Sequence, residues 1–593
     1  MSALAEDHDH GVLPAVIEAA NSPPTRKRTA PRGTASYPRK RAVTACQVCR
    51  ARRTKCDSKK PSCSFCTKIG AKCITAAVDF STFDPASLEI IERLDRLESL
   101  LTTQPSKPQA PDLPDSVEDE KHSTARATQF LGTHHPLSLI SSAVLSWPVF
   151  LGRWDKEADA LTRLRPLAQP ESPSSTTYSS APSVESLLDN PSASEELLER
   201  FFKHVHIKNP ILEMSTLRKM VRHVCLDGLG WDAESCLVLL IWTLGAISTA
   251  FDDPNPCTRD SLNLASGLFS AAAKRLGALY ATTGVVPAQC FFYAGVYLMS
   301  VFRPKAAWRH FIQALACCQD FEFATQTLRH PQSFENSSQA PAMEQRLYWS
   351  CWKSEVELRL HLGLVDFKVQ DRVYPGRFPT LPSEPDSDSR AWFFYLAEIS
   401  LRRLNTRARN DIGRLADTDG GENWQDLIKL VVSYESQVQR WLESLPETIS
   451  LTTSPEDDDV LKNILRCHMV DFYELLYWTF TAAAINQKER STAVDSYAKK
   501  GLDTAVERLD NAKFGFRYRH HGTWLLLQSS TRSAILLLAA HQSSSMQDML
   551  PVNWLDMVSR AMEMLQFWIE DDESALDQFM ILAQLHSAAL RRA

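Results

Sequence analysis

The sequence predicts a chain of three parts: a small metal-stabilised domain, a short coiled-coil helix and a large all-α domain, joined by long disordered segments. Three observations lead to this prediction. Six cysteines fall between positions 46 and 73, apolar residues have heptad spacing between 90 and 101, and apolar residues recur every three to four positions from about 194 to 593. With 593 residues and 44% hydrophobic composition, the chain can bury more than one core.

Residues 1–40 form a basic arm rich in Pro, Thr, Arg and Ala, which we expect to be disordered. Residues 21–60 hold thirteen Lys and Arg against one Asp, although the whole chain has a net charge of -6. A basic segment tethered to an acidic remainder is typical of proteins that bind polyanions. Two basic clusters in the arm are candidates for nuclear import or phosphate contacts, with a merely solvated arm as the alternative. They are Arg26, Lys27, Arg28, Arg39, Lys40 and Arg41.

The cysteines of residues 41–76 have the spacing of metal ligands. They form two repeats of Cys-x2-Cys-x6-Cys, made by Cys46, Cys49, Cys56, Cys63, Cys66 and Cys73. Six thiolates complete two tetrahedral zinc sites only if two sulfurs are shared, because separate sites need eight ligands. A segment this small has no apolar core, so we expect zinc to supply its folding free energy, on the order of 10 kcal/mol.

The segment CQVCRARRTKCDSKKPSCSFCTKIGAKC resembles the fungal zinc binuclear cluster (Zn2Cys6) DNA-binding domain at every cysteine spacing and at the loop proline, Pro61. The resemblance implies two Zn²⁺ ions bridged by Cys46 and Cys63, and a first half that enters the major groove of double-stranded DNA. It also implies that Arg53 reads a CGG-type triplet, at a position where Lys is common in the family. Arginine can bond guanine bidentately. Phosphate contacts that set the register are expected from Arg50, Arg52 and Lys55.

Residues 77–83 are a predicted linker, and residues 84–103 are a predicted helix that begins with Asp84 as N-cap and Pro85 as its first residue. Its apolar residues have the a/d spacing of a parallel coiled coil. They are Ile90, Leu94, Leu97 and Leu101. About two heptads are present, so we expect a weak homodimer that other regions support. An amphipathic helix docked on its own chain is the alternative.

Residues 104–193 are predicted to be a mostly disordered linker, because Pro and Ser are frequent. The apolar patch at 135–164 is an exception to this prediction of disorder: we expect it to be either a docked helix or an embedded short motif. Ser192 and Glu195 have the spacing of a capping box, which predicts that the all-helical domain opens at about residue 194 and continues to 593.

Three-to-four-residue apolar spacing predicts the helices of this domain. It covers 261–280, 288–321, 343–362, 390–410, 424–442, 460–485, 493–512, 523–541 and 553–569. The apolar runs 235–251 and 288–302 are short for membrane spans, so we expect buried core helices and no membrane association. Eight dispersed cysteines are expected to be reduced core residues.

Several of these stretches resemble the fungal-specific transcription factor regulatory domain, also called the middle homology region. They are 201–213, 230–247, 269–277, 289–314 and 345–364. The resemblance implies an all-helical regulator, for which a small-molecule effector or a coregulator is a candidate partner.

Enzyme motifs are missing from the sequence: it has no Gly-rich phosphate loop, no Gly-x-Ser-x-Gly and no His-Glu-x-x-His. His204, His206 and Glu213 are a candidate site, but surface residues or satisfied polar residues are the preferred interpretation. Six aromatic residues are expected in the core, with an effector-pocket lining as the alternative. They are Phe291, Phe292, Tyr293, Tyr297, Trp349 and Trp352.

The acidic and apolar stretch 568–585 is either an activation segment or a helix packed on the body. The expected apolar face consists of Leu576, Phe579, Met580, Leu582 and Leu585.

Together these features predict a nuclear, zinc-dependent, sequence-specific regulator of RNA polymerase II genes that binds two triplets as a homodimer and is not an enzyme. The first alternative is a nuclear corepressor or scaffold whose zinc domain binds DNA weakly or not at all. An enzyme fused to a zinc domain is the second.

Overall fold

The computed structural model describes residues 54, 57, 62–69, 139–150, 184–251, 253, 257–321, 342–364, 389–418, 424–486 and 491–591. The chain divides into two compact units, Met1–Asp79 and Phe80–Ala593. Within the described ranges both units contain helices and turns and no strand. None of the helices described is long and apolar enough to cross a membrane.

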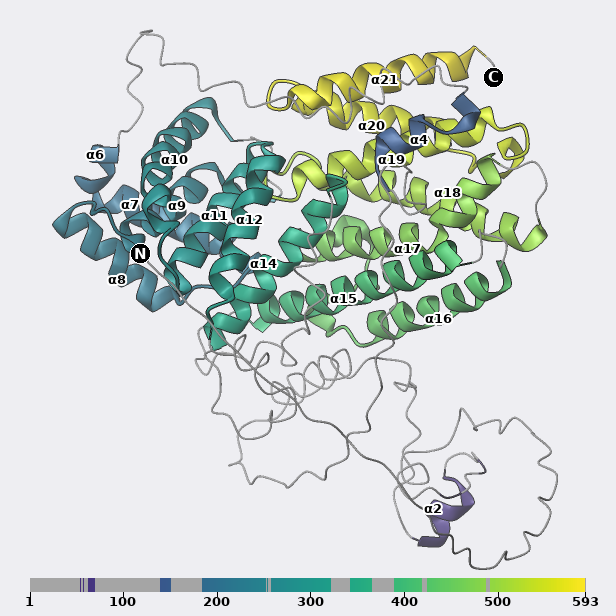
Figure 1. Ribbon diagram of the computed structural model, residues 1–593, viewed down its shortest axis with the longest axis horizontal. Coiled ribbons are helices and arrows are strands. Elements are labelled where there is room, and N and C mark those ends of the chain that lie inside the picture. The colour runs from purple at the N-terminus through teal and green to yellow at the C-terminus, as the bar shows by residue number, and fades with distance from the viewer. Residues whose placement is uncertain are drawn as a thin grey trace, which may run out of the picture. The chain divides into compact units, whose positions relative to one another are not determined.

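The first unit contains the short helix α2 (Ser64–Ile69). The second unit, the body, is built from helices, most of them long (Figure 1). They are α4 (Ser141–Leu145), α6 (Val184–Leu188), α7 (Pro191–His204), α8 (Met214–Asp227), α9 (Ala233–Ile247), α10 (Arg259–Leu279), α11 (Val285–Ser300), α12 (Pro304–Cys318), α14 (Ala342–His361), α15 (Ser389–Thr418), α16 (Trp424–Glu443), α17 (Val460–Asn486), α18 (Thr492–Ala512), α19 (Thr523–Gln542), α20 (Trp554–Trp568) and α21 (Glu573–Leu590). Short 3-10 helices η2 (Pro148–Phe150), η3 (His206–Lys208), η4 (Glu447–Ile449), η5 (Pro455–Asp457) and η6 (Gln547–Met549) connect them.

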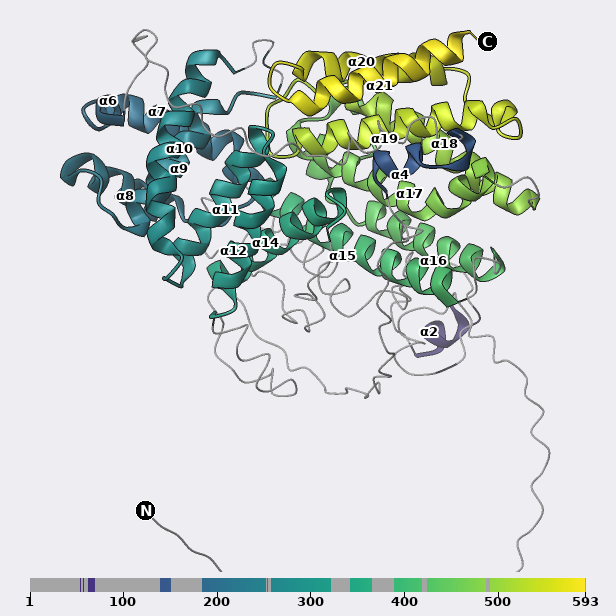
Figure 2. The same ribbon diagram turned by 45° about the horizontal axis from the view of Figure 1, so that its top comes forward.

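The body has two halves joined by a central helix. Helices α7 to α12 form one half and α15 to α21 form the other, as both ribbon views show (Figures 1 and 2). Helix α14 packs against α11 and α12 on one side and against α15 and α19 on the other. The side chains of α14 are therefore surrounded by protein along most of its length.

Helices α9, α11 and α19 form much of the core. All side chains of α9 from Ser235 to Ile247 are buried, as are those of α11 from Pro287 to Ser300. Gly245 permits a close approach of α9 to α7, because a Cβ there would lie 2.1 Å from the carbonyl oxygen of Leu197. The prediction that the two apolar runs are buried core helices is confirmed.

Most predicted helices agree with the structure to within a few residues, but three boundaries were wrong. The helix predicted at 390–410 is α15, which continues to Thr418. The pattern at 288–321 is two helices, α11 and α12, because the chain turns at Phe302, which has a φ of 58°, and Pro304 starts the second helix. Helix α7 begins before the predicted capping box. Its N-cap is Asn190, whose side chain accepts a hydrogen bond from the amide of Ala193.

Part of the predicted linker is docked on the body. All five residues of α4 are buried, and α4 packs against α19. Arg532 donates a 2.9 Å hydrogen bond to the carbonyl oxygen of Leu139, and the rings of Trp147 and Trp478 lie 5.7 Å apart. The prediction of a docked helix in the apolar patch is confirmed for residues 139–150.

The stretch 568–585 begins at the last residue of α20, continues through the turn that follows it and forms most of α21, so the packed-helix interpretation is confirmed. Asp572 caps α21 by accepting a 3.0 Å hydrogen bond from the amide of Ser574. The predicted face is partly wrong: Leu582 and Leu585 are buried, but Leu576 and Met580 are 45% and 50% exposed. The buried stripe is therefore rotated about the helix axis from the expected one.

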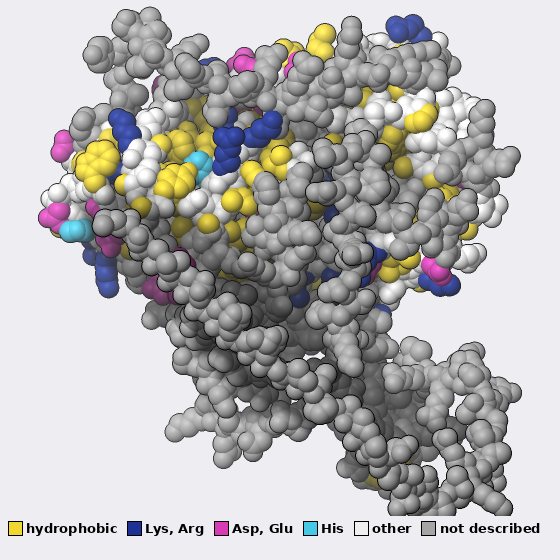
Figure 3. Space-filling model, viewed as in Figure 1, with side chains coloured by type: hydrophobic (Ala, Val, Ile, Leu, Met, Phe, Trp, Pro, Cys, Tyr) yellow, Lys and Arg dark blue, Asp and Glu magenta, His cyan; other side chains and the backbone are white. Residues whose placement is uncertain are grey.

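The body surface mixes apolar and basic side chains. Where side chains are visible in Figure 3, hydrophobic groups lie among Lys and Arg over the early helices. Trp231 is 70% exposed, and the guanidinium of Arg275 lies 5.0 Å from its ring centroid. Such a contact keeps an exposed indole ordered and partly covered.

Candidate functional site

The first unit holds two of the six predicted zinc ligands in the described residues. Cys63 immediately precedes α2 and Cys66 lies in its first turn, so the three-residue spacing places both sulfurs on one side. Both side chains are fully buried. The amide of Cys66 donates a hydrogen bond to Cys63 Sγ at 3.4 Å.

Asp57 ties the start of α2 to the chain that follows Cys56. Its Oδ1 accepts a 3.0 Å hydrogen bond from the amide of Ser64, and its Oδ2 accepts one of 2.5 Å from the Ser64 hydroxyl. Because Asp57 directly follows the last cysteine of the first triplet, this contact joins the two cysteine triplets. It lies beside Cys63, the first ligand of the second triplet.

The donor set fits zinc. Two buried sulfurs one helical turn apart, in a unit with few buried apolar residues among those described, are the arrangement that a soft divalent ion stabilises. The other four predicted ligands lie outside the described residues: Cys46, Cys49, Cys56 and Cys73. The same holds for the predicted DNA contacts, the dimerisation stripe and the nuclear import clusters.

The body contains a cavity with about 860 Å³ of empty space, counting the solvent at its mouth. Helices α14, α15, α17, α18 and α19 line it, together with the residues just before α19 and with Lys208 of η3. Helix α14 contributes Lys353, Glu357 and His361, which are four residues apart and so share one face.

Each carboxylate that lines the cavity has a cation partner. The ion pairs are Lys353 with Glu398, Arg402 with Glu357, and Arg508 with Asp471. Burial alone would raise the pKa of Glu398, but the Lys353 ammonium and then His468 outweigh it and hold that pKa well below its usual range. The carboxylates are therefore ionised and neutralised within the protein.

Glu474 lies behind the cavity wall and holds two arginines. It accepts hydrogen bonds from Arg508 at 2.6 Å and from Arg532 at 2.7 and 2.5 Å. Burial alone would raise the pKa of Glu474, but Arg508 and Arg532 together hold it below the usual range. This buried network fixes the positions of α17, α18 and α19 relative to one another.

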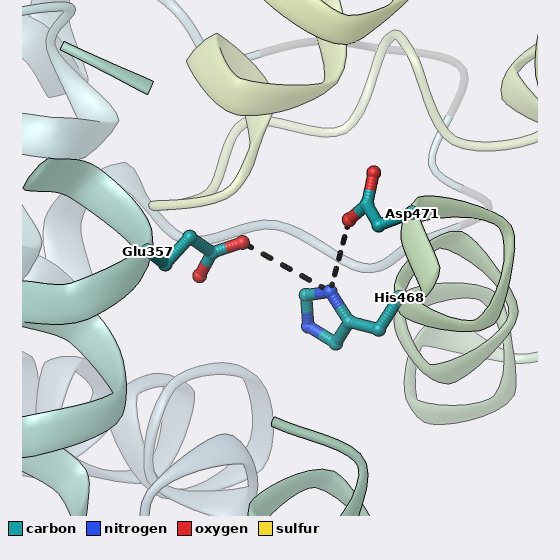
Figure 4. A group of neighbouring side chains, drawn as sticks. All are labelled: Glu357, His468 and Asp471. Atoms are coloured by element: carbon teal, nitrogen blue, oxygen red, sulfur yellow. Dashed lines mark ion pairs between the residues drawn. The ribbon is translucent and has the colours of Figure 1, made fainter. Parts of the chain in front are cut away.

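Glu357, His468 and Asp471 lie close enough to hold a metal ion, with ligand atoms within 4.8 Å of one another. Figure 4 shows Glu357 reaching from α14 toward His468 and Asp471 of α17. However, Arg402 Nη2 lies 2.8 Å from His468 Nδ1 and pairs with Glu357, while Arg508 holds Asp471. Cations of the protein already neutralise this set, so it fits an ion-pair network better than a metal site.

The cavity offers no activated thiol. Burial is the main reason that the pKa of Cys467, on the cavity wall, rises to about 12. His521 is neutral near pH 7, because burial lowers its pKa to about 3. The lining is therefore suited to binding a ligand by charge and shape.

The residues singled out from the sequence do not form this cavity. His206 is a satisfied core histidine, as preferred: its Nε2 lies 3.1 Å from the carbonyl oxygen of Leu212, and burial lowers its pKa to about 4. Neither His204 nor Glu213 lines the cavity. All six aromatic residues are buried in the core and none lines the cavity, so the core interpretation is confirmed.

The cavity residues were missed because five helices far apart in the sequence supply them. One signal was present. Lys353, Glu357 and His361 repeat at four-residue spacing in a helix whose remaining positions are rich in aromatic and aliphatic residues. A charged stripe on a helix that lacks a solvent face indicates a buried polar site.

Comparison with known proteins gives two matches. Residues 44–79 match the family model of the fungal Zn(2)-Cys(6) binuclear cluster domain. The chain is also 25% identical, over 516 residues, to a protein of Aspergillus rugulosus provisionally named transcription factor ecdB. That alignment covers 79% of this chain and 84% of the relative. No solved structure matches the chain.

The matched segment contains all six cysteines, including the buried pair Cys63 and Cys66. The zinc prediction is thus confirmed, whereas the regulatory-domain resemblance of the body stays a prediction. Residues 44–79 form a fungal Zn(2)-Cys(6) binuclear cluster domain, which binds two zinc ions.

Proposed function

We propose that this chain is a zinc-dependent, DNA-binding transcription regulator of RNA polymerase II genes that acts in the nucleus. The observation that carries the proposal is the match of residues 44–79 to the binuclear cluster domain. The Aspergillus rugulosus relative, named a transcription factor, supports it across most of both chains. The all-helical body then serves as the regulatory part of the protein.

The zinc domain recognises DNA through basic residues placed around the cluster. The two zinc ions supply the folding free energy that holds the cysteine triplets together. Arg50, Arg52 and Lys55 contact phosphates and set the register. Arg53 bonds O6 and N7 of guanine in a CGG-type triplet, which is worth about 1–3 kcal/mol of discrimination.

The active form is a homodimer that reads two triplets. A cluster that contacts about three base pairs cannot select genes alone, so pairing of two domains provides the specificity. The stripe of residues 90–101 has the spacing to pair two chains in parallel. The basic clusters of the N-terminal arm direct nuclear import.

The test is selection of binding sites from random duplex DNA by the zinc-loaded full chain at fixed salt. We expect enrichment of paired CGG-type triplets at a preferred spacing. Arg53→Ala should flatten discrimination at the guanines by about 1–3 kcal/mol. The matched control, Arg52→Ala, should weaken binding to all sequences alike and reduce the salt slope by about 1, as a phosphate contact does.

Each other outcome contradicts a named part of the proposal. Failure of the zinc-loaded chain to enrich any sequence would favour the corepressor or scaffold instead. Enrichment of single triplets would refute the homodimer. An unchanged base preference in Arg53→Ala would assign the guanine contact to another residue.

A further inference from the structure

Lys208 is a buried cation at the cavity wall. It lies in η3, between α7 and α8, and its side chain is only 3% exposed although it lines the cavity. Its Nζ donates a 2.9 Å hydrogen bond to the hydroxyl of Tyr518 and lies 4.6 Å from the centroid of that ring. A lysine ammonium has three protons to donate, so this one hydrogen bond leaves donor capacity at the cavity.

Lys208 differs from the other basic side chains of the lining. Lys353 and Arg508 each pair with a carboxylate. Among the described residues, Lys208 makes no ion pair, and the lining carboxylates are paired with other cations. Burying an ammonium without an anion is costly. An anion brought in from solution would remove that cost.

Two further features of the lining favour an anion in the cavity. The hydroxyl of Ser530, on α19, is buried on the cavity lining and has no hydrogen-bond partner. The N-terminal end of α19 also borders the cavity through Gly522 and Leu525. Helix N-termini carry partial positive charge and unpaired amides. At α19 the amides of Gly522 and Thr523 already donate to His520, and Gly522, the N-cap residue, supplies no side chain to cap the amides that follow.

The rest of the lining includes apolar side chains. Phe394 of α15, Ile464 and Val470 of α17, and Leu525 and Leu526 of α19 border the cavity. Ligand sites in proteins commonly combine an apolar wall with a few convergent polar groups. This lining therefore suits a ligand that has an anionic head and an apolar portion.

We propose that the cavity binds a small amphipathic organic acid, a carboxylate or a phosphate ester, whose anionic group pairs with the Lys208 ammonium. The apolar part of the ligand contacts the α15, α17 and α19 side chains, and the hydroxyl of Ser530 donates to the ligand. Because η3 belongs to the first half of the body and α19 to the second, such a ligand bridges both halves. Binding at this site does not depend on the DNA-binding function.

The charge state of Lys208 makes the binding dependent on pH. Burial lowers the pKa of Lys208 to about 7, so the free protein loses the ammonium as the pH rises through that value. The titratable groups that face Lys208 are Tyr518, His520 and His521 before α19 and Lys353 of α14. Burial keeps the two histidines neutral near pH 7 by lowering their pKa values, and it raises the pKa of Tyr518, so none of these groups supplies an anion. An anion beside the amine favours the charged form and raises its pKa. Binding near pH 7 is therefore expected to take up a proton and to weaken as the pH rises.

The test uses isothermal titration calorimetry of the full chain with octanoate, octyl phosphate, inorganic phosphate and uncharged 1-octanol, each up to about 10 mM. We expect at least one amphipathic acid to bind, at least about tenfold more tightly than 1-octanol, and more tightly at about pH 6 than at about pH 8. Comparison of octanoate with octyl phosphate identifies the preferred head group. Binding of inorganic phosphate alone would contradict the need for an apolar portion.

Lys208→Met should weaken binding of the acid about ten- to a hundredfold, the loss expected for a charge-assisted contact, and abolish the pH dependence. The matched control is Lys203→Met, an exposed lysine on α7, which should bind as the wild type does. Ser530→Ala should weaken binding by a few fold. Proton uptake by the wild type, measured in two buffers of different ionisation enthalpy, needs no variant.

The proposal is overturned if neither amphipathic acid binds, if 1-octanol binds as tightly as the acids, or if Lys208→Met binds them unchanged. Should Lys208→Met fail to fold, absent proton uptake by the wild type together with full binding by Ser530→Ala would also overturn it.

Discussion

The zinc domain and the helical body reach a fixed structure by different physical means. Around α2, two buried cysteine sulfurs and one aspartate contact organise the described residues of the first unit. In the body, long helices such as α9 and α11 bury nearly every side chain. One unit depends on a bound metal and the other on buried apolar area. The two units should therefore fail under different conditions.

The second difference concerns charge. The zinc cluster concentrates negative thiolates that basic neighbours must balance, whereas the body buries ion pairs that balance one another. Lys208 is the exception on the cavity wall, since it makes no ion pair with any of the residues that the structure describes. Removing zinc, breaking buried ion pairs and lowering the pH should therefore affect the stability of the two units differently.

Zinc removal should give the largest effect. A strong chelator should unfold the residues of the zinc domain, which lose on the order of 10 kcal/mol of folding free energy, and abolish DNA binding. The helical circular dichroism of the body and its thermal transition should stay nearly unchanged. Cys63→Ser should lower the zinc content, whereas Cys257→Ser, a cysteine of the body, should keep two zinc ions per chain. Loss of body helicity on chelation would show that the two units are not independent.

Breaking the buried ion pairs should give the next largest effect, and only in the body. Glu474→Ala leaves Arg508 and Arg532 without their shared carboxylate, which should destabilise the body by about 3–5 kcal/mol. Chemical denaturation followed by circular dichroism measures it. The control is Glu570→Ala, whose exposed partner Arg259 lies 3.9 Å away, with an expected change of about 0–1 kcal/mol. Equal losses in both variants would contradict the assigned role of Glu474.

Mild acid should have the smallest effect and a definite sign. The pKa values of Glu398, Asp471 and Glu474 are held below normal in the folded body, because nearby cations outweigh burial. The unfolded chain then binds protons first as the pH falls. Stability from these groups is fully present above about pH 5.5 and declines below about pH 4.5, by up to about 1.4 kcal/mol per pH unit for each carboxylate. Denaturation midpoints measured between neutral pH and pH 4 check this; a midpoint that rises with acid would contradict it.

Local sequence patterns predicted most of the body because they depend on one helix at a time. The predicted helix 424–442 is α16 (Trp424–Glu443), since its apolar stripe alone determines which face is buried. The predicted start of α7 was wrong because two local sequence signals competed there. Ser192 had the spacing of a capping box, but Pro191 fits the first helical position, so Asn190 became the N-cap.

The cavity was beyond local patterns for a physical reason. Lys208 and Ser530 lie more than three hundred residues apart in the sequence, and only tertiary packing, which includes contacts of η3 with α15 and of α14 with α19, brings both to one cavity. The zinc ligands were predictable because their chemistry requires short, fixed spacing. The spacing of Lys353, Glu357 and His361 could have indicated a buried polar stripe on one helix. It could not have indicated which side chains of the other helices this stripe faces.

The docked segment at 139–150 changes how truncated forms of this protein behave. Arg532 holds the carbonyl oxygen of Leu139 while it also binds Glu474, so the same guanidinium connects α4, α17 and α19. A deletion of all of 104–193 would remove α4, which packs against α19, one of the helices that line the cavity. Its phenotype would be loss of stability, and it would be mistaken in deletion mapping for loss of a regulatory sequence.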